Sequence, residues 1–252
     1  MMSDRDLTTL AQPEFKEEID AMLQQFVQRF YTEVEGGDHL LRSERIDLSY
    51  YKRNVTEIIL RLRMKRWIDA LTIHYFTKHD PFLAKKWAQY TEDEMLHDEM
   101  FIKDLERLGM SREEVYSTEP MFSTKLLQGY FYYGLEHEGR PLASLASSYF
   151  IECVSVYTQP DWIDNIEKRL GAGTAKGQRT HVHHDVEDDH TLFVWNVLMK
   201  FVRNEEDKAR IRDHIVNVYT LFCAFYTELH RKTIARKAAE PALVAVLAAC
   251  GQ

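Results

Sequence analysis

Residues that break helices are scarce in this sequence. Ten glycines and six prolines occur among 252 residues, and their clusters separate long segments in which apolar residues recur with a helical period. Short alternating segments bounded by turn residues, which are typical of β-strands, are missing. No linker is long enough to divide two hydrophobic cores. The sequence therefore predicts an all-α protein in which residues 1–252 form a single helical domain.

Cysteine is also rare, and long apolar segments are missing. Cys153, Cys223 and Cys250 form no CxxC pair, which argues against a disulfide framework and a thiolate metal site. No apolar run reaches the roughly 18 residues of a membrane span, and the N-terminus shows no signal-peptide pattern. We therefore expect a cytoplasmic protein that makes no contact with a membrane.

Clusters of positive charge are missing as well. The 32 lysines and arginines are outnumbered by 40 aspartates and glutamates, which gives a net charge of −8. No segment gathers enough basic residues to neutralise a run of phosphates, so a nucleic acid is not an expected partner.

The sequence does contain seven long segments of helical periodicity. Ser111 and Glu114 form a capping-box pattern that predicts a short additional turn, and Pro160 predicts a kink or interruption in the fifth segment. We expect a seven-helix bundle from residues 13–34, 48–78, 81–109, 120–138, 141–170, 179–202 and 205–239.

Two ionisable residues interrupt the apolar stripe of the third predicted helix. Glu94 and His97 stand between Tyr90 and Phe101, all at steps of three or four residues. An unpaired carboxylate in the core costs several kcal/mol, so it must be protonated, paired with a cation or bound to a metal. The ExxH spacing puts both side chains within about 60° of arc, which suits one ion. An isolated ExxH pair is also common on a solvent-exposed face.

The fifth predicted helix shows the same anomaly. Glu152 follows Tyr149 in an apolar stripe, and no lysine or arginine stands at helical spacing to pair with it. A partner on another helix remains an alternative to metal binding.

The sixth predicted helix gives the strongest pattern. His183, Glu187 and His190 occupy positions i, i+4 and i+7, and the stripe continues inward as Val194. Two imidazoles and a carboxylate are the ligands that non-haem iron favours. The alternative is that residues 181–190 form a solvated, charged segment.

Together, the helices near residues 81–108, 141–158 and 179–202 offer three carboxylates and three imidazoles. Six such groups can bind two divalent ions, with some ligands shared between the ions and the others bound to one ion. A structural zinc ion, in contrast, takes four ligands, which usually include cysteine. Three negative charges do not neutralise two divalent cations, which leaves room for hydroxide, a substrate carboxylate or reduced oxygen. The composition favours O2 chemistry over hydrolysis.

With these motifs, the sequence resembles the haem-oxygenase-like diiron oxidases and oxygenases, which include an undecene-forming fatty-acid decarboxylase, desaturase-lyases and N-oxygenases. The resemblance is carried by segments 94–97, 104–111 and 148–152 and by the three polar residues of the sixth helix. It implies a haem-oxygenase-like bundle. It also implies the metal ligands Glu94, His97, Glu152, His183, Glu187 and His190. The family more often has aspartate where Glu187 stands, and some members take the carboxylate of Glu94 from elsewhere.

The resemblance further implies an O2-dependent, non-haem diiron enzyme with two Fe(II) ions and O2 as cofactors. Its substrate would be a small amine, amino acid or fatty acid. The outcome would be N-oxygenation, desaturation or oxidative C–C cleavage. An external electron donor is compatible with this chemistry, and apolar residues on all seven helices are compatible with a homodimer.

Three alternatives compete with this interpretation. A ferritin-like diiron N-oxygenase would take Glu57 as an additional ligand, although Arg53 and Arg61 stand within helical reach of Glu57 and favour a salt bridge. A non-catalytic helical scaffold would pair the buried carboxylates with cations of the second predicted helix, Arg61 and Lys65 among them. A cofactor-free hydrolase would need Cys153 as its nucleophile, although a core cysteine is the simpler explanation.

Overall fold

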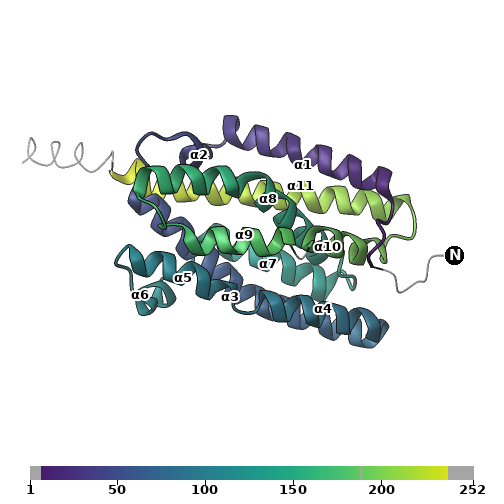
Figure 1. Ribbon diagram of the computed structural model, residues 1–252. Helices are drawn as coiled ribbons and strands as arrows, with labels where there is room; N and C mark the ends of the chain where they lie inside the picture. The colour runs from purple at the N-terminus through teal and green to yellow at the C-terminus, as the bar shows by residue number, and fades with distance from the viewer. Residues whose placement is uncertain (1–6, 188, 238–252) are drawn as a thin grey trace, which may run out of the picture.

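The computed structural model describes residues 7–187 and 189–237 (Figure 1). Within these residues every regular element is helical, and none of the helices combines the length and apolar character needed to cross a bilayer. The elements are α1 (Pro13–Glu33), α2 (His39–Arg42), α3 (Leu48–His79), α4 (Pro81–Glu94), α5 (His97–Arg107), α6 (Arg112–Ser117), α7 (Phe122–His137), α8 (Leu142–Leu170), α9 (Lys176–Glu187), α10 (His190–Met199), α11 (Glu205–His230) and the π-helical turn η1 (Arg231–Ala235).

Most of the predicted helices are confirmed. The first, second, fourth and fifth predicted segments correspond to α1, α3, α7 and α8, and the capping box of Ser111 and Glu114 starts α6. Pro160 lies inside α8, which continues through it without interruption. The seventh predicted segment becomes α11 and η1, and its last two residues, 238 and 239, lie outside the described residues.

The predicted number of seven helices is wrong, chiefly because two predicted helices are each divided. The third ends as α4 at Glu94 and resumes as α5 at His97. The sixth ends as α9 at Glu187 and resumes as α10 at His190. At the second break Asp189 has a left-handed backbone (φ 48°), and its side chain accepts a hydrogen bond from a backbone N–H of α10. Asp189 is therefore the N-cap of α10. Helix α10 begins as a separate helix, and its side chains are not in register with those of α9.

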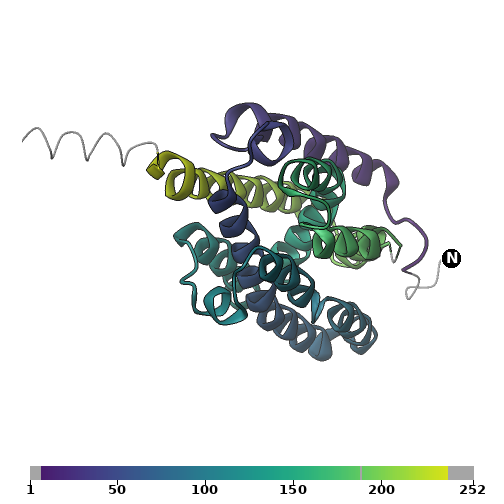
Figure 2. The same ribbon diagram turned by 60° about the vertical axis from the view of Figure 1, so that its left-hand side comes forward.

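The helices are arranged so that α5, α8 and α9 meet inside the bundle. Helices α1, α8 and α11 lie side by side, and α3, α4 and α5 form the opposite side (Figures 1 and 2). Helix α9 lies between the two groups and packs against both α5 and α8, while α10 packs against α8. Side chains from three separate parts of the sequence therefore face one another.

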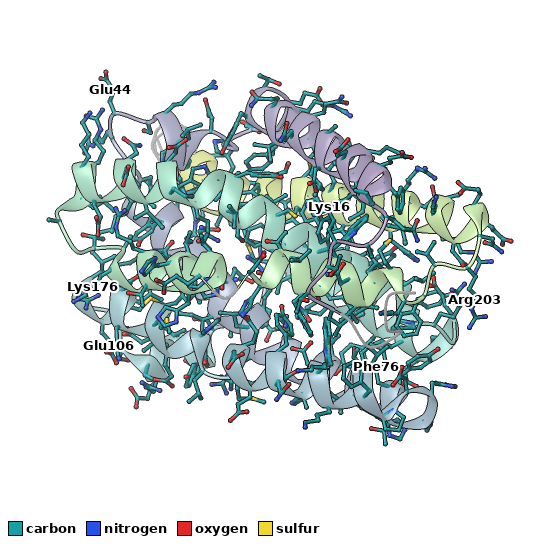
Figure 3. All side chains as sticks on the ribbon, turned by 45° about the vertical axis from the view of Figure 1, so that its right-hand side comes forward. Lys16, Glu44, Phe76, Glu106, Lys176 and Arg203 are labelled. Carbon is teal, nitrogen blue, oxygen red and sulfur yellow. The ribbon has the colours of Figure 1, made fainter. Side chains whose placement is uncertain are left out.

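One continuous hydrophobic cluster holds the helices together. Its largest fully buried side chains include Trp87, Trp195 and Phe76. Figure 3 shows side chains filling the space between helices, with α9 and α10 running between the labelled Lys176 and Arg203.

The start of α9 is fixed against α5 by hydrogen bonds and by close packing. The buried Asp104 carboxylate of α5 accepts from the backbone N–H groups of Gly177 (2.7 Å) and Gln178 (3.0 Å). These are among the first N–H groups of α9, which have no partner within the helix. A Cβ atom on Gly177 would lie 2.0 Å from the carbonyl oxygen of Met100. Only glycine therefore permits this approach of α9 to α5.

Gly177→Ala is expected to lower the free energy of unfolding by about 2 to 3 kcal/mol, because the added methyl group must push α9 away from α5. Denaturant titration measures this change. Gly129→Ala is the matched control: Gly129 lies on the exposed side of α7 with no atom within 4 Å of a built Cβ. The control should gain up to about 1 kcal/mol from helix propensity. An unchanged midpoint for Gly177→Ala would contradict the described packing.

Candidate metal centre

Six ionisable side chains converge between α4, α5, α8, α9 and α10. We call this group the carboxylate–imidazole cluster. Its members are Glu94, His97, Glu152, His181, Asp185 and His190.

The break between α4 and α5 places two members of the cluster. Glu94 is the last residue of α4 and His97 is the first of α5, and His97 Nδ1 lies 3.3 Å from Glu94 Oε2. Both side chains are buried, with exposures of 8% and 7%. The other oxygen of Glu94 lies 3.2 Å from Nδ1 of His190. Glu94 therefore stands between two imidazoles that come from different helices.

The break between α9 and α10 places three more members. His181 and Asp185 lie one turn apart on α9, with 2.9 Å between Nδ1 and Oδ2. The second oxygen of Asp185 lies 3.7 Å from Nδ1 of His190, the first residue of α10. The rings of His97 and His181 meet edge to face, with centroids 4.5 Å apart. Asp185 thus lies beside the imidazoles on both sides of the break.

Glu152 completes the cluster from α8. It is buried, and its Oε1 accepts a hydrogen bond of 2.5 Å from the hydroxyl of Tyr90 on α4. Lys65 of α3 lies over the Tyr90 ring, 4.8 Å from its centre, while its ammonium group pairs with Asp69 at 2.7 Å. Tyr90 therefore orients the Glu152 carboxylate from a position that is itself held by α3.

The arrangement fits metal ions. Two sets of three ligand atoms each lie within 4.8 Å of one another: Glu94 with His97 and His181, and Glu94 with Glu152 and His190. Several buried cluster atoms have contacts but no hydrogen bond of acceptable geometry, and buried polar atoms without partners are rare in folded proteins. The cluster atoms without a hydrogen bond are Glu94 Oε1, His97 Nδ1, His181 Nδ1, Asp185 Oδ1 and His190 Nδ1. Bound cations would satisfy them.

The metal-free cluster holds protons at neutral pH. Burial acts to raise the pKa of Glu94, but the imidazoles of His190 and His97 outweigh it and hold this pKa well below its ordinary range. Burial acts to lower the pKa of His190, but Glu94 and Glu152 outweigh it and raise this pKa to about 9. Burial and the charge of Glu94 raise the pKa of Glu152 to about 7. At neutral pH His190 is therefore protonated and Glu152 partly protonated, so a cation that binds there would have to displace protons.

Four of the six predicted ligands lie in the cluster: Glu94, His97, Glu152 and His190. The structure does not bring the remaining two there. His183 and Glu187 are 68% and 62% exposed and lie 3.3 Å from each other at the surface. The prediction treats residues 179–202 as one uninterrupted helix. Because α9 ends at Glu187 and α10 begins at His190, the side chains of α10 are not in helical register with those of α9. On α9 they point roughly 200° away from His181 and Asp185.

Glu57, the ligand that a ferritin-like site would add, also lies elsewhere. It is fully buried, forms a 2.5 Å ion pair with Arg53 and accepts hydrogen bonds from the Met121 N–H and the Thr124 hydroxyl. The ferritin-like interpretation loses its additional carboxylate. The predicted salt bridge is present, and of the two arginines within helical reach it is Arg53 that forms it.

Sequence reasoning missed three residues of the site: His181, Asp185 and Tyr90. The sequence held one signal for the first two, because His181 and Asp185 also stand four residues apart. An aspartate directly before His190 was a second signal, since aspartate is a preferred N-cap residue. Tyr90 was expected only as a core residue, and no local pattern linked it to Glu152.

The helical-scaffold and cysteine-hydrolase interpretations receive no support from the described residues. Lys65 pairs with Asp69 and Arg66 with Asp98, so neither forms an ion pair with a carboxylate of the cluster. Cys153 is buried and burial raises the pKa of its thiol to about 12, so a thiolate nucleophile is not available at neutral pH.

Comparison with known proteins supports an iron site. A family model described as an iron-containing redox enzyme matches residues 62–222, which is more than half of the chain and includes the whole cluster. The chain belongs to this family of iron-containing redox enzymes. No curated protein sequence matches it significantly.

Solved structures similar to this iron-containing redox enzyme show its fold. A domain of unknown function with a heme oxygenase-like fold from Shewanella denitrificans OS217 has a TM-score of 0.75 at 18% identity, covering 86% of this chain and 92% of that chain. A TenA homolog from Pseudomonas syringae pv. tomato DC3000 has a TM-score of 0.68 at 11% identity, covering 92% and 98%. A CADD-like protein of unknown function from Nostoc punctiforme PCC 73102 has a TM-score of 0.62 at 13% identity, covering 86% and 99%. The predicted haem-oxygenase-like fold is confirmed.

His181→Ala is expected to reduce the iron bound per chain, because it removes an imidazole from the cluster. His183→Ala is the matched control: it removes an imidazole from the same helix at an exposed position and should leave the iron content unchanged. Colorimetric iron analysis after anaerobic loading measures both. The reverse result, in which His183→Ala loses iron and His181→Ala retains it, would show that His183 rather than His181 faces the cluster.

Iron affinity is expected to increase as the pH rises from about 6 to about 9, because Glu152 loses its proton near a pKa of about 7 and His190 near about 9. Each displaced proton contributes up to about tenfold in affinity per pH unit below its pKa. Anaerobic Fe(II) titrations across this range measure the effect. An affinity independent of pH would mean that the cluster releases no proton.

Proposed function

We propose that the carboxylate–imidazole cluster binds two Fe(II) ions and uses O2 to oxidise a small organic substrate. The observation that carries this proposal is the position of Glu94, which belongs to both three-residue groups of ligand atoms. A carboxylate with two oxygens can bridge two ions, and each group adds imidazole or carboxylate ligands of the kind that non-haem iron favours.

Each residue of the cluster has a definite part in this proposal. His97 and His181 would hold one ion and Glu152 and His190 the second, with Glu94 between them. Asp185, close to His181 and His190, could serve either ion. Ferrous iron would supply electrons and open coordination positions for the reduction of O2.

The chain itself contributes burial and orientation. Glu94, His97, Glu152 and His190 are all buried, which keeps bulk water from the reacting groups. The Tyr90 hydroxyl holds the Glu152 carboxylate in place. Protons leaving Glu152 and His190 on metal binding leave the cluster with its full negative charge, which suits divalent cations.

A cavity of about 180 Å³ adjoins the cluster and provides room for a substrate. Glu94, Glu152, His181 and Asp185 form part of its wall. The rest of the wall is largely apolar, and its aromatic members include Phe26, Phe30, Phe131, Trp162, Tyr219 and Tyr226. A mostly apolar pocket with a few polar groups is typical of a small-molecule site.

The proposed reaction is N-oxygenation, desaturation or oxidative C–C cleavage of an amine, amino acid or fatty acid. Reduction of O2 to water consumes more electrons than a two-electron oxidation of the substrate releases. We therefore propose an external electron donor as a partner.

Anaerobic loading with Fe(II) is expected to give about two iron ions per chain, and exposure to O2 should then consume O2. Glu94→Ala should lose most of the iron, because Glu94 serves both groups. His183→Ala should match the wild-type chain in both measurements. Binding of a single ion per chain, or normal loading without any O2 uptake, would falsify the proposed function.

A further inference from the structure

An arginine that forms no ion pair within residues 7–187 and 189–237 lines the cavity. Arg61 of α3 is part of the cavity wall, and its Nη1 atom is buried without a hydrogen bond. No ion pair or hydrogen bond joins its guanidinium to any of the described residues. The neighbouring cations of α3 differ, since Lys65 pairs with Asp69 and Arg66 with Asp98.

The nearest carboxylate on the same helix is not available to Arg61. Glu57 lies one turn earlier, but its Oε1 is occupied by Arg53 and the Met121 N–H, and its Oε2 by the Thr124 hydroxyl. The guanidinium instead stacks on the ring of Phe225, 4.3 Å from its centre. Stacking fixes the guanidinium plane while leaving its N–H groups free at the edge.

The Arg61 side chain is half-buried, and its Nη1 atom is buried without a hydrogen-bond partner, which is unfavourable. Burial lowers the pKa of Arg61, yet an arginine stays protonated in proteins, so it cannot escape the cost by losing its proton. A buried donor of a charged group is costly to leave without an acceptor, and an anion held by the N–H edge would offset that cost.

Two side-chain amides also line the cavity. Gln128 of α7 and Asn54 of α3 line the cavity, and each has a buried amide oxygen without a hydrogen-bond partner. Helices α3 and α7 run in the same direction: Glu57 contacts Thr124 near the start of α7, and Thr72 lies beside Ser144, which follows the end of α7. Arg61 and Gln128 each stand four residues after the Glu57–Thr124 contact. The arginine and the amide therefore belong to the same stretch of wall.

We propose that Arg61 binds the carboxylate of the substrate, so that the molecule oxidised at the cluster is a carboxylic acid rather than a simple amine. This inference rests on the proposed function, in which the other end of the substrate is oxidised at the carboxylate–imidazole cluster. The guanidinium is a fork of donors that matches a carboxylate with two parallel hydrogen bonds. The amide oxygen of Gln128, which has no hydrogen-bond partner among the described residues, can accept a hydrogen bond from an amino group of the same molecule.

The position of Arg61 also restricts where oxidation occurs. Arg61 stands one turn, roughly 6 Å along the axis of α3, from Lys65. Lys65 in turn covers the ring of Tyr90, whose hydroxyl contacts Glu152 of the cluster. A carboxylate held by Arg61 is thus separated from the metal ligands, and the reacting bond lies several atoms away from it.

Binding to the metal-free protein tests this proposal. The probes are 3-phenylpropanoate, L-phenylalanine, phenethylamine and octanoate, each titrated calorimetrically up to millimolar concentrations. The first three share one ring and differ only in their carboxylate and amino groups. We expect at least one carboxylate probe to bind and phenethylamine to bind at least tenfold more weakly. Preference for L-phenylalanine indicates an amino acid substrate, and preference for octanoate indicates a fatty acid.

Three variants separate the role of Arg61 from general effects. Arg61→Gln should weaken carboxylate binding by about 10- to 100-fold, as expected for a hydrogen-bonded charge pair. Arg61→Lys should retain part of the affinity. Arg63→Gln is the matched control, because Arg63 also lies on α3 and stacks on an aromatic ring, that of Tyr116, but is not part of the cavity wall. It should bind like the wild-type chain.

The proposal is overturned if no carboxylate binds, if phenethylamine binds as tightly as its matched acid, or if Arg61→Gln leaves the affinity unchanged. Iron content is measured separately on the same preparations, and Arg61→Gln should bind as much iron as the wild-type chain. Loss of iron from the wild-type chain would contradict the proposed function without affecting the carboxylate result.

Discussion

The burial of three carboxylates among three imidazoles is the constraint on which the centre of this protein depends. In a low-dielectric interior these groups must be neutralised, and the described residues provide no lysine or arginine ion pair for Glu94 or Glu152. Protons on His190 and Glu152 serve this purpose in the metal-free form. Two divalent cations would serve it better, because they would also engage the atoms that now lack hydrogen bonds.

Helix breaks are the structural means by which these groups converge. Glu94 and His97 stand on the two sides of one break, and Asp185 and His190 stand near the two sides of the second. An unbroken helix directs a single stripe at its neighbour, whereas two joined segments can aim their ligands independently. The close approach of α9 at Gly177 holds the second pair against α5.

The cavity connects two sites of opposite charge. The carboxylate–imidazole cluster forms part of its wall and the cationic Arg61 another part. The Lys65–Asp69 ion pair and aromatic side chains line the rest of the wall. A substrate with an anionic end and a reactive end is complementary to this distribution. In the proposed complex, the substrate carboxylate would supply the hydrogen-bond acceptor that the buried Nη1 atom of Arg61 lacks among the described residues.

Local sequence patterns were enough to predict the helical class, most helix positions and the placing of Glu94, His97, Glu152 and His190 in one cluster. These follow from apolar periodicity and from the cost of burying charge. The inward orientation of His181 and Asp185, rather than His183 and Glu187, emerges only in the folded chain, because the break before His190 uncouples the phases of α9 and α10. The neutralisation of Glu57 by Arg53, not Arg61, likewise depends on tertiary packing, since spacing along a helix leaves the side-chain geometry of an ion pair undetermined.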